Sequence, residues 1–396
     1  MESTQSNKDN WKEENDRIIR AAGVNIDDYV ALRRDIHQHA EGKYMEVRTS
    51  GIVYDRLISF GLKPEDIRKV ATTGLEVNIQ GTGESLTPVS GLPDMIAIRA
   101  DMDALNMPET TDVPYKTSTE WAHMCGHDGH TVMLLAAAQV LIQNRDKIPK
   151  SKTLRLFFQP AEEGGAGAVA MVKEGVMENV QEVYGLHNAS MFNEGEIRTI
   201  VGTMMAGACG VKITVKGKGG HGSFPQYQFV FTICTINAGS AMNVFPDECV
   251  MTGTVRSYTE AVMKQVTDYI RLIATNVAVG LNCTAEVEFQ GLDSTALPVI
   301  NTKTETQNVV RVAQKVFGEE RVSDQGLPLP GSEDFAFFLK EKPGCFLGLG
   351  TKPPSQTQVI MPHTSFYDFN DTMIASGAVL WVRLVEDRFG VSVLPQ

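Results

Sequence analysis

The sequence of 396 residues lacks the features that would direct a chain to a membrane or out of the cell. It has no apolar run of transmembrane length. Its first twenty residues are polar and charged, without the apolar core of a signal peptide, and its last residues carry no retrieval or prenylation signal. We therefore expect a cytoplasmic protein that has no membrane partner.

The sequence also lacks an excess of positive charge. It contains 36 Lys and Arg against 48 Asp and Glu, which gives a formal net charge of -12. Such an acidic chain is poorly suited to bind nucleic acid or anionic lipid. A hydrophobic content of 42% and a charged content of 21% are typical of a folded globular protein, and the length predicts two domains.

Three familiar signatures are missing as well. The six cysteines form no C-x-x-C pair, which argues against a disulfide framework. No G-x-S-x-G sequence occurs, so a serine hydrolase of the nucleophile-elbow type is disfavoured. No H-E-x-x-H sequence occurs either, which removes the usual helical zinc-peptidase motif.

Histidine is scarce, and its distribution is informative. The whole chain has only eight His, yet residues 121–130 contain three of them together with Cys125 and Asp128. The C-x-H spacing allows Cys125 and His127 to reach one metal ion. This segment is the one part of the sequence that indicates a functional site without support from any other.

The order of the expected elements predicts an α/β fold. Short apolar strands at 95–100, 154–158 and 183–186 alternate with helices, including a long buried helix that begins at His127. This alternation is typical of a mostly parallel sheet. Before it we expect a frayed or weakly helical lead-in over residues 1–25.

A different pattern begins near residue 208. Residues 211–216 and 249–257 alternate between apolar and polar side chains, as half-exposed antiparallel strands do, and residues 260–279 have the period of an amphipathic helix. We expect a small α+β domain inserted into the larger one. The predicted boundaries are 1–207 and 293–396 for the catalytic domain and 208–292 for the insertion.

Several residues able to bind metal follow the expected strands closely. In an open α/β sheet, ligands collect beyond the carboxyl ends of the strands, so one edge could gather them. Thiolate and imidazole suit Zn²⁺, whereas carboxylate and imidazole also accept Mn²⁺ or Co²⁺, so one or two ions of unfixed identity are predicted. The candidate ligands are Cys125, His127, Glu163, His187 and His363.

Glu162 lies beside the candidate ligand Glu163. A two-metal site suits amide hydrolysis, and such a site needs a carboxylate that takes a proton from the attacking water and passes it to the leaving amine. Taken alone, each position also has a structural interpretation. A Glu pair at a helix start favours the helix dipole, His187 could be a hydrogen-bonded buried His, and His363 could be an ordinary loop residue.

The chain resembles the metallopeptidase-like amidohydrolases that include aminoacylases, hippurate hydrolases and auxin–amino acid conjugate hydrolases. The matching segments follow the family order over nearly the whole chain. They are RRDIHQH (33–39), RADMDAL (99–105), HMCGHDGH (123–130), FQPAEEG (158–164), GLH (185–187), KGKGGH (216–221), NVFPD (243–247), GTVR (253–256), GSEDF (331–335) and Pro362-His363.

The resemblance implies that the five candidate ligands bind the metal and that Glu162 is the general base. It also implies that 208–292 is a lid and dimerisation domain. His221 would stabilise the tetrahedral intermediate, and Asn243 and Arg256 would hold the carboxylate of a small amide substrate.

The chain departs from the family pattern in the inserted domain. Only 21 residues separate His221 from Asn243, where relatives have a long amphipathic helix, so one lid helix is expected to be missing. As a result, we expect the sheet either to expose apolar residues such as Val211, Ile213 and Val215 or to bind something else on that face, and we expect a homodimer to be weakened.

Two functional hypotheses follow. The first is a metal-dependent amidohydrolase that cleaves N-acyl amino acids or similar amide conjugates. The alternative is a catalytically impaired relative that binds metal or ligand without efficient turnover, because its lid is truncated.

Overall fold

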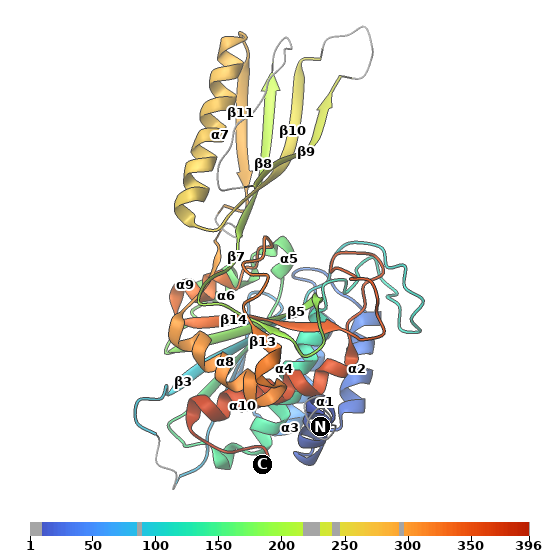
Figure 1. Cartoon of the computed structure of the whole chain (residues 1–396), viewed down its shortest axis with the longest axis vertical. Coiled ribbons are helices and arrows are strands. Elements are labelled where there is room, and N and C mark those ends of the chain that lie inside the picture. The colour runs from blue at the N-terminus through green and yellow to red at the C-terminus, as the bar shows by residue number, and fades with distance from the viewer. Residues whose placement is uncertain (1–9, 85–88, 217–229, 240–245, 293–296, 396) are drawn as a thin grey trace, which may run out of the picture. The chain divides into compact units, whose positions relative to one another are not determined.

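A computed structural model describes residues 10–84, 89–216, 230–239, 246–292 and 297–395. Among these residues, no helix combines the length and the apolarity needed to cross a membrane. The chain forms two compact units, coloured along the sequence in Figure 1. The first contains Met1–Gly202, Asn301–Leu327 and Phe337–Gln396, and the second contains Thr203–Ile300 and Pro328–Ala336.

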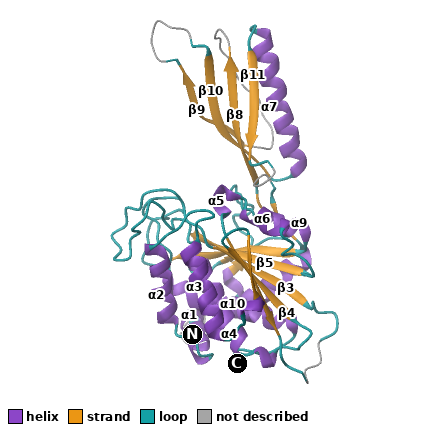
Figure 2. Cartoon of the chain, turned by 180° about the vertical axis from the view of Figure 1, so that it is seen from behind, coloured by secondary structure: helices purple, strands orange, loops and turns teal. Residues whose placement is uncertain are grey.

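An eight-stranded sheet forms the centre of the first unit (Figure 2). Its four middle strands are mutually parallel, as the alternation of strands and helices predicted, and antiparallel strands flank them. In spatial order the strands are β1 Ile67–Val70, β2 Gly74–Gln80, β4 Thr153–Gln159, β3 Met95–Asp101, β5 Glu182–Asn193, β14 Gly344–Lys352, β6 Ile197–Arg198 and β13 Val322–Ser323.

The helices of the first unit pack around this sheet. Helix α4 is apolar over most of its circumference and is almost entirely buried, as expected for a helix enclosed on all sides. Its close neighbour α10 carries Gly377, where a Cβ atom would lie 2.0 Å from the sulfur of Met133. The helices are α1 Trp11–Ala21, α2 Ile26–Gln38, α3 Val47–Phe60, α4 His127–Gln143, α5 Glu162–Gly165, α6 Gly167–Lys173, α8 Lys303–Phe317, α9 Ala336–Glu341 and α10 Ile374–Phe389, with single 3-10 turns at Pro64–Asp66, Arg145–Lys147, Glu319–Arg321 and Asp371–Met373.

Helix α1 is better anchored than the sequence led us to expect. Ile19 is fully buried, and the side chain of Asn15 is buried and donates a hydrogen bond to the backbone oxygen of Val316 at 3.2 Å. The prediction of a frayed lead-in is therefore wrong for residues 11–21. Its physical reason is tertiary: α1 packs against α8 and α10, which a local pattern does not reveal.

The second unit is built on a four-stranded antiparallel sheet in the order β11-β8-β10-β9, with one long helix, α7, on one face (Figure 1). Thr259 caps this helix, since its side chain accepts a hydrogen bond from the backbone of Val262. The elements are β8 Gly207–Lys216, β9 Val230–Ala238, β10 Glu248–Ser257, α7 Glu260–Gly280 and β11 Thr284–Gln290; the short strands β7 Gly202–Met205 and β12 Val299–Asn301 pair where the chain crosses between units.

The face of this sheet that α7 covers differs from our expectation. Val211 and Ile213 are buried in a core with Val255 and with Met263 and Ile270 of α7, so the prediction that they are exposed is wrong. Alternation along the strand identified two faces but not which of them the remaining helix covers. Of the connection between His221 and Asn243, residues 230–239 are described and contain β9, whereas the rest, and the side chain of Val215, lie outside the described residues, so the absence of the helix stays a prediction.

Candidate metal centre

Three neighbouring parallel strands bring the candidate site residues to one region of the first unit. Strand β3 ends at Asp101, β4 ends at Gln159 just before Glu162 and Glu163, and β5 carries His187. The order β4-β3-β5 sets these positions side by side. This is the gathering of polar side chains that the sheet-edge argument predicted.

His127, the first residue of α4, is oriented by Asp103. Its Nδ1 lies 2.9 Å from the backbone oxygen and 3.3 Å from Oδ1 of Asp103, so Nδ1 is the donor in this contact. Nε2 is buried and has no hydrogen-bond partner. A buried ring nitrogen without a partner, on a ring whose other nitrogen is held in place, is the arrangement expected of a metal ligand.

His187 is fixed in the same way from β5. Its Nδ1 donates to the backbone oxygen of Asn188 at 2.8 Å, and its Nε2 lies 3.3 Å from the sulfur of Cys125. Burial lowers the pKa of His187 to about 3, which keeps the ring neutral at physiological pH. Cys125 and His187 therefore present a sulfur and a ring nitrogen to each other.

Glu163 and His363 complete the group around Cys125. The ligand atoms of these three residues lie within 4.8 Å of one another, and Nε2 of His363 is 3.1 Å from Oε1 of Glu163. That carboxylate oxygen is buried and lacks an aligned hydrogen bond, so the contact is one of charge and proximity. The backbone amide of His363 donates to the oxygen of Met124 at 2.8 Å, which ties its loop to the Cys125 segment.

The backbone is strained at two of these positions. His363 has φ 64°, and Ala161, just before Glu162, has φ 54°. Left-handed conformations are costly for residues with a side chain and persist where surrounding contacts impose them, often at functional sites. Here one such residue is a candidate ligand and the other directly precedes the Glu162-Glu163 pair.

Asp103 organises this cluster, a role that the sequence analysis missed. Its Oδ1 accepts from the backbone amide of Glu162 at 3.1 Å and its Oδ2 from that of Glu163 at 2.9 Å, while it also accepts from His127. One carboxylate thus positions the candidate base and two candidate ligands. The Asp-Met-Asp spacing after β3 was the available signal, because it sends Asp101 and Asp103 to the same side of the strand.

Asp101 and His130 form a second buried layer. The ligand atoms of both lie within 4.8 Å of those of His127 and His187. However, Nδ1 of His130 lies 2.6 Å from Asp101, and its Nε2 accepts from the amide of Asn188 at 2.9 Å, so both ring nitrogens are occupied. Asp101 is also paired with Arg99 at 2.6 Å. We therefore interpret His130 as a support for His187 rather than a ligand.

The electrostatics of the cluster favour a bound cation. Burial lowers the pKa of His127, but the nearby carboxylates of Asp101 and Asp103 outweigh it and raise the pKa to about 10. Burial and the charges of Glu163 and Glu162 raise the pKa of the Cys125 thiol well above its usual range. The shift of His127 and part of the shift of Cys125 reflect buried negative charge, which a divalent ion bound here would neutralise while displacing those protons.

The residues present fit a metal ion on three grounds. Nε2 of His127 and Oε1 of Glu163 are buried without a hydrogen-bond partner, and Nε2 of His187 has only the sulfur of Cys125, itself a candidate ligand, as its partner. Nitrogen, sulfur and carboxylate ligands together are typical of Zn²⁺ sites and also accept Mn²⁺. The candidate holders are Cys125, His127, Glu163, His187 and His363.

Three predicted site residues belong to the second unit. Arg256 lies on β10, and its Nη1 donates to the backbone oxygen of Pro330 at 2.8 Å. His221 and Asn243 lie outside the described residues, so their predicted roles are untested by the structure.

Two side chains of α2, Arg33 and His37, form a buried ionic network next to the cluster. Arg33 is fully buried and contacts Asp128, which follows His127, at 3.2 Å and Asp368, which follows the His363 loop, at 2.8 Å. His37 lies between Asp128 at 2.9 Å and Glu109 at 3.3 Å. The RRDIHQH segment thus connects the two chain segments that carry His127 and His363.

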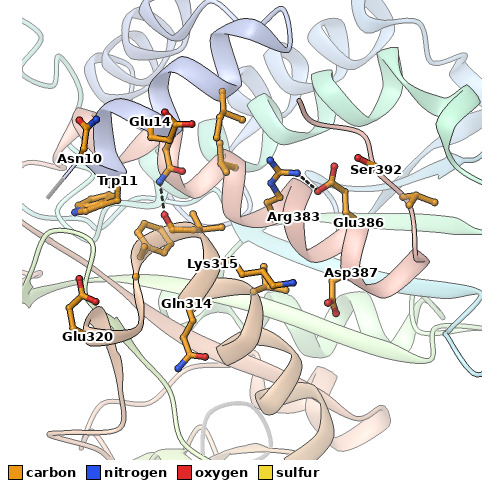
Figure 3. Close-up of a pocket in the computed structure, with 18 residues that line it drawn as sticks. Asn10, Trp11, Glu14, Gln314, Lys315, Glu320, Arg383, Glu386, Asp387 and Ser392 are labelled. Atoms are coloured by element: carbon orange, nitrogen blue, oxygen red, sulfur yellow. Dashed lines mark hydrogen bonds and ion pairs between the residues drawn. The ribbon is translucent and has the colours of Figure 1, made fainter. Parts of the chain in front are cut away.

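The first unit also has a cavity of about 920 Å³ that contains none of the candidate ligands (Figure 3). It lies between α1, the end of α8 and α10, with Trp11 and Phe317 on its walls and the Arg383–Glu386 pair beside it. Its lining lacks the convergent unpartnered groups seen around His127. This cavity therefore does not coincide with the candidate metal site, and cavity volume alone does not identify that site.

Comparisons with known proteins identify the family of the chain. The profile of Peptidase family M20/M25/M40 matches residues 97–387. The IAA-amino acid hydrolase ILR1-like 5 of Arabidopsis thaliana is 33% identical over 385 residues, covering 90% of this chain and 85% of the relative. The hippurate hydrolase of Campylobacter jejuni is 31% identical over 388 residues, covering 90% of this chain and 95% of the relative.

A solved structure extends the match to the fold. A dinuclear metal-binding peptidase of the M20 family from Bacillus subtilis superposes with a TM-score of 0.77 at 27% identity and covers 93% of this chain and 99% of its own. An N-acetylcysteine deacetylase from the same organism is 31% identical over 350 residues, covering 81% of this chain and 88% of the relative. The chain belongs to peptidase family M20/M25/M40 and is a hydrolase of amide bonds.

Proposed function

We propose that this protein is a metal-dependent amidohydrolase that cleaves the amide bond of N-acyl amino acids or similar conjugates. The observation that carries the proposal is the gathering of His127 and His187, each with its Nδ1 held by an oxygen acceptor, near Cys125 and Glu163, with Glu162 close to His127. The names of the relatives support the substrate class. Auxin conjugates, hippurate and N-acetylcysteine each join an acyl group to an amino acid through an amide.

We assign the metal to Cys125, His127, Glu163, His187 and His363, as Zn²⁺ or Mn²⁺, with Co²⁺ also compatible and one or two ions per chain. When bound there, a divalent ion polarises the scissile carbonyl and makes water more acidic. Asp103 and Asn188 hold the two ring tautomers that such a role requires.

Glu162 is the general base of the proposal. Its carboxylate accepts a proton from the attacking water and donates it to the nitrogen of the leaving amino acid, which restores the starting state. The hydrogen bond from its backbone amide to Asp103, at 3.1 Å, holds the backbone of Glu162 in place next to Glu163.

The parts of the proposal that involve the second unit depend on family resemblance. His221 would stabilise the tetrahedral intermediate, and Asn243 and Arg256 would bind the carboxylate of the substrate. We assign the catalytic role to 1–207 and 293–396 and the lid and dimerisation role to 208–292. If the chain forms a homodimer, the shortened lid would weaken the dimer contact that the resemblance assigns to 208–292.

The alternative is a relative that binds metal or ligand but turns over poorly. The single feature that favours it is the short connection between His221 and Asn243. It predicts normal metal binding together with negligible hydrolysis, and it predicts no loss of turnover in His221→Ala.

The decisive experiment measures hydrolysis by the purified chain after chelation and reloading with Zn²⁺, Mn²⁺ or Co²⁺. The substrates are N-acetyl, N-benzoyl and indole-acetyl amino acids, and the readout is released amino acid. Loss of general acid–base catalysis in Glu162→Gln should lower kcat by about 10²- to 10⁴-fold. Glu65→Gln is the matched control, because that side chain is exposed. Unchanged activity in Glu162→Gln would contradict the proposal.

A further inference from the structure

The loop that carries Glu162 has a backbone conformation that it does not hold by itself. We call residues 161–166 the base loop. Ala161, Gly164 and Ala166 have left-handed φ angles of 54°, 72° and 58°. Such angles are costly for residues with a side chain and persist only where surrounding contacts impose them. The position of the proposed general base therefore depends on groups that contact this loop from other segments.

Glu46, which follows α2 in the chain, supplies one of these contacts. The residue is fully buried, and its Oε1 accepts a hydrogen bond from the backbone amide of Ala161 at 2.9 Å. The same oxygen accepts from the backbone amide of Tyr44 at 3.0 Å, and Oε2 accepts from the hydroxyl of Thr73 in the turn between β1 and β2. One buried carboxylate thus joins the start of the base loop to two other segments of the first unit.

Tyr44 holds the other end of the base loop. Its hydroxyl donates to the backbone oxygen of Gly165 at 2.8 Å. A Cβ atom on Gly165 would lie 2.5 Å from Cβ of Ala161 and 3.3 Å from Cε2 of Tyr44, so the loop closes tightly on itself with the tyrosine ring against it. Tyr44 and Glu46 therefore hold the loop on both sides of the Glu162-Glu163 pair.

These contacts complement those of Asp103. Asp103 accepts from the amides of Glu162 and Glu163 themselves, whereas Glu46 and Tyr44 hold the residues that flank this pair. Side chains from two distant segments together fix four backbone groups within five consecutive residues. A carboxylate that must meet a water molecule at a defined place needs a backbone fixed in this way.

We propose that Glu46 and Tyr44 are positioning residues for the reaction: by bracing the base loop in its left-handed conformation, they place the carboxylate of Glu162 for proton transfer. The catalytic part of this inference rests on the proposed function, whereas the bracing contact does not. A displacement of about 1 Å in a reacting geometry costs about 10²-fold in rate, so the brace has a measurable effect on turnover.

Two variants of Glu46 separate the brace from the negative charge. Glu46→Gln keeps an oxygen that accepts from the amides of Ala161 and Tyr44, and its amide group can donate to the hydroxyl of Thr73. Glu46→Ala removes all three contacts. If the position of an acceptor matters and the charge does not, Glu46→Gln should behave like the parent chain and Glu46→Ala should not.

Hydrogen–deuterium exchange of the metal-free chain tests the bracing contact without any measurement of activity. In peptides that cover 159–167, Glu46→Ala should exchange about tenfold faster than the parent or more, because a buried hydrogen bond to a carboxylate is lost. Tyr44→Phe should quicken the same peptides by several fold, since it removes only the contact to Gly165.

Glu41→Ala is the matched control for this exchange measurement. The carboxylate of Glu41 also accepts from two backbone amides, those of Arg48 and Thr49 at 2.8 Å each, but these belong to α3. The control should quicken exchange at the start of α3 and leave the base loop unchanged. Circular dichroism verifies that each variant is folded.

Steady-state kinetics at saturating metal tests the catalytic part, with an N-acyl amino acid that the parent chain hydrolyses. Glu46→Ala should lower kcat by about 10- to 100-fold with KM within about threefold of the parent, because a base acts on the transition state and not on substrate binding. The number of bound ions should equal that of the parent. Glu46→Gln should restore kcat to within a few fold.

Three results would overturn the inference. One is unchanged exchange of the base loop in Glu46→Ala, and another is faster exchange with an unchanged kcat. The third is a Glu41→Ala variant that loosens the base loop as much as Glu46→Ala does, which would indicate a general loss of stability. By contrast, a parent chain that hydrolyses no substrate but whose base loop loosens in Glu46→Ala would contradict the proposed function and support the bracing contact.

Discussion

The metal cluster of the first unit and the sheet with its helix in the second unit are incomplete in opposite ways. Around His127 and Glu163, buried polar atoms lack hydrogen-bond partners, whereas among the described residues of β9 and α7 several large apolar side chains are exposed. Both conditions are costly for a protein alone. The first is relieved by a cation and the second by an apolar surface, so the kind of mismatch identifies the kind of partner.

The largest effect is expected from the residue that holds the cluster together. Asp103→Ala removes the acceptor for His127 and for the amides of Glu162 and Glu163. Loss of such supporting contacts should weaken metal affinity by about 10- to 100-fold and lower turnover further. Competition with a chelating dye measures the affinity. The exposed Asp112→Asn serves as control, and equal affinity in Asp103→Ala would show that the cluster is not organised by this carboxylate.

The next effect concerns stability rather than chemistry. Arg33→Met leaves Asp128 and Asp368 without their buried cation, which should cost about 3–5 kcal/mol of unfolding free energy. Arg34→Gln removes a half-exposed pair with Asp371 and should cost at most about 1 kcal/mol. Urea denaturation compares the two. Similar costs for both variants would mean that the network contributes no more than an ordinary surface pair.

His37 makes this stability depend on pH. Burial lowers its pKa, but hydrogen bonds to Asp128 and Glu109 outweigh burial and raise it to about 9. Because the folded state binds the proton more tightly than the unfolded state, the stabilisation is complete below pH 6.5 and is lost as the pH rises through 9. The total is on the order of 3 kcal/mol.

Unfolding free energies at pH 6 and pH 9.5 would detect this loss, and His37→Gln should flatten that difference. If His37→Gln keeps the same slope as the parent chain, another group is responsible.

The smallest effect lies in the second unit. Thr259→Ala removes the side-chain cap of α7 and should cost about 1 kcal/mol. Because the contact is local, hydrogen exchange should quicken in α7 while α4 is unaffected. Equal changes in α4 would mean that the two units unfold together.

The central architecture could be predicted because its signals are local. Apolar runs at 95–100, 154–158 and 183–186 became β3, β4 and β5, and the helix from Val47 to Phe60 ends at Gly61, which has the left-handed φ of 110°. Parallel neighbours then place polar residues at strand ends together. This reasoning explains why the region of the cluster could be located from the sequence.

What could not be predicted depends on contacts between distant segments. Whether α1 is frayed depends on Val316, some 300 residues away, and which face of β8 is covered depends on the position of α7. The role of Asp103 required the direction of two backbone amides, which no residue pattern specifies. The proposed roles of His221 and Asn243 are supported only by the resemblance of the sequence to the family.

The central claim is tested most directly by metal titration of the chelated chain with turnover of an N-acyl amino acid followed in the same samples. The account predicts that activity is absent without metal and rises in step with binding of one or two ions per chain, and that His187→Gln binds fewer ions and turns over less. Full activity in the metal-free chain, or ions bound equally well by His187→Gln, would contradict it.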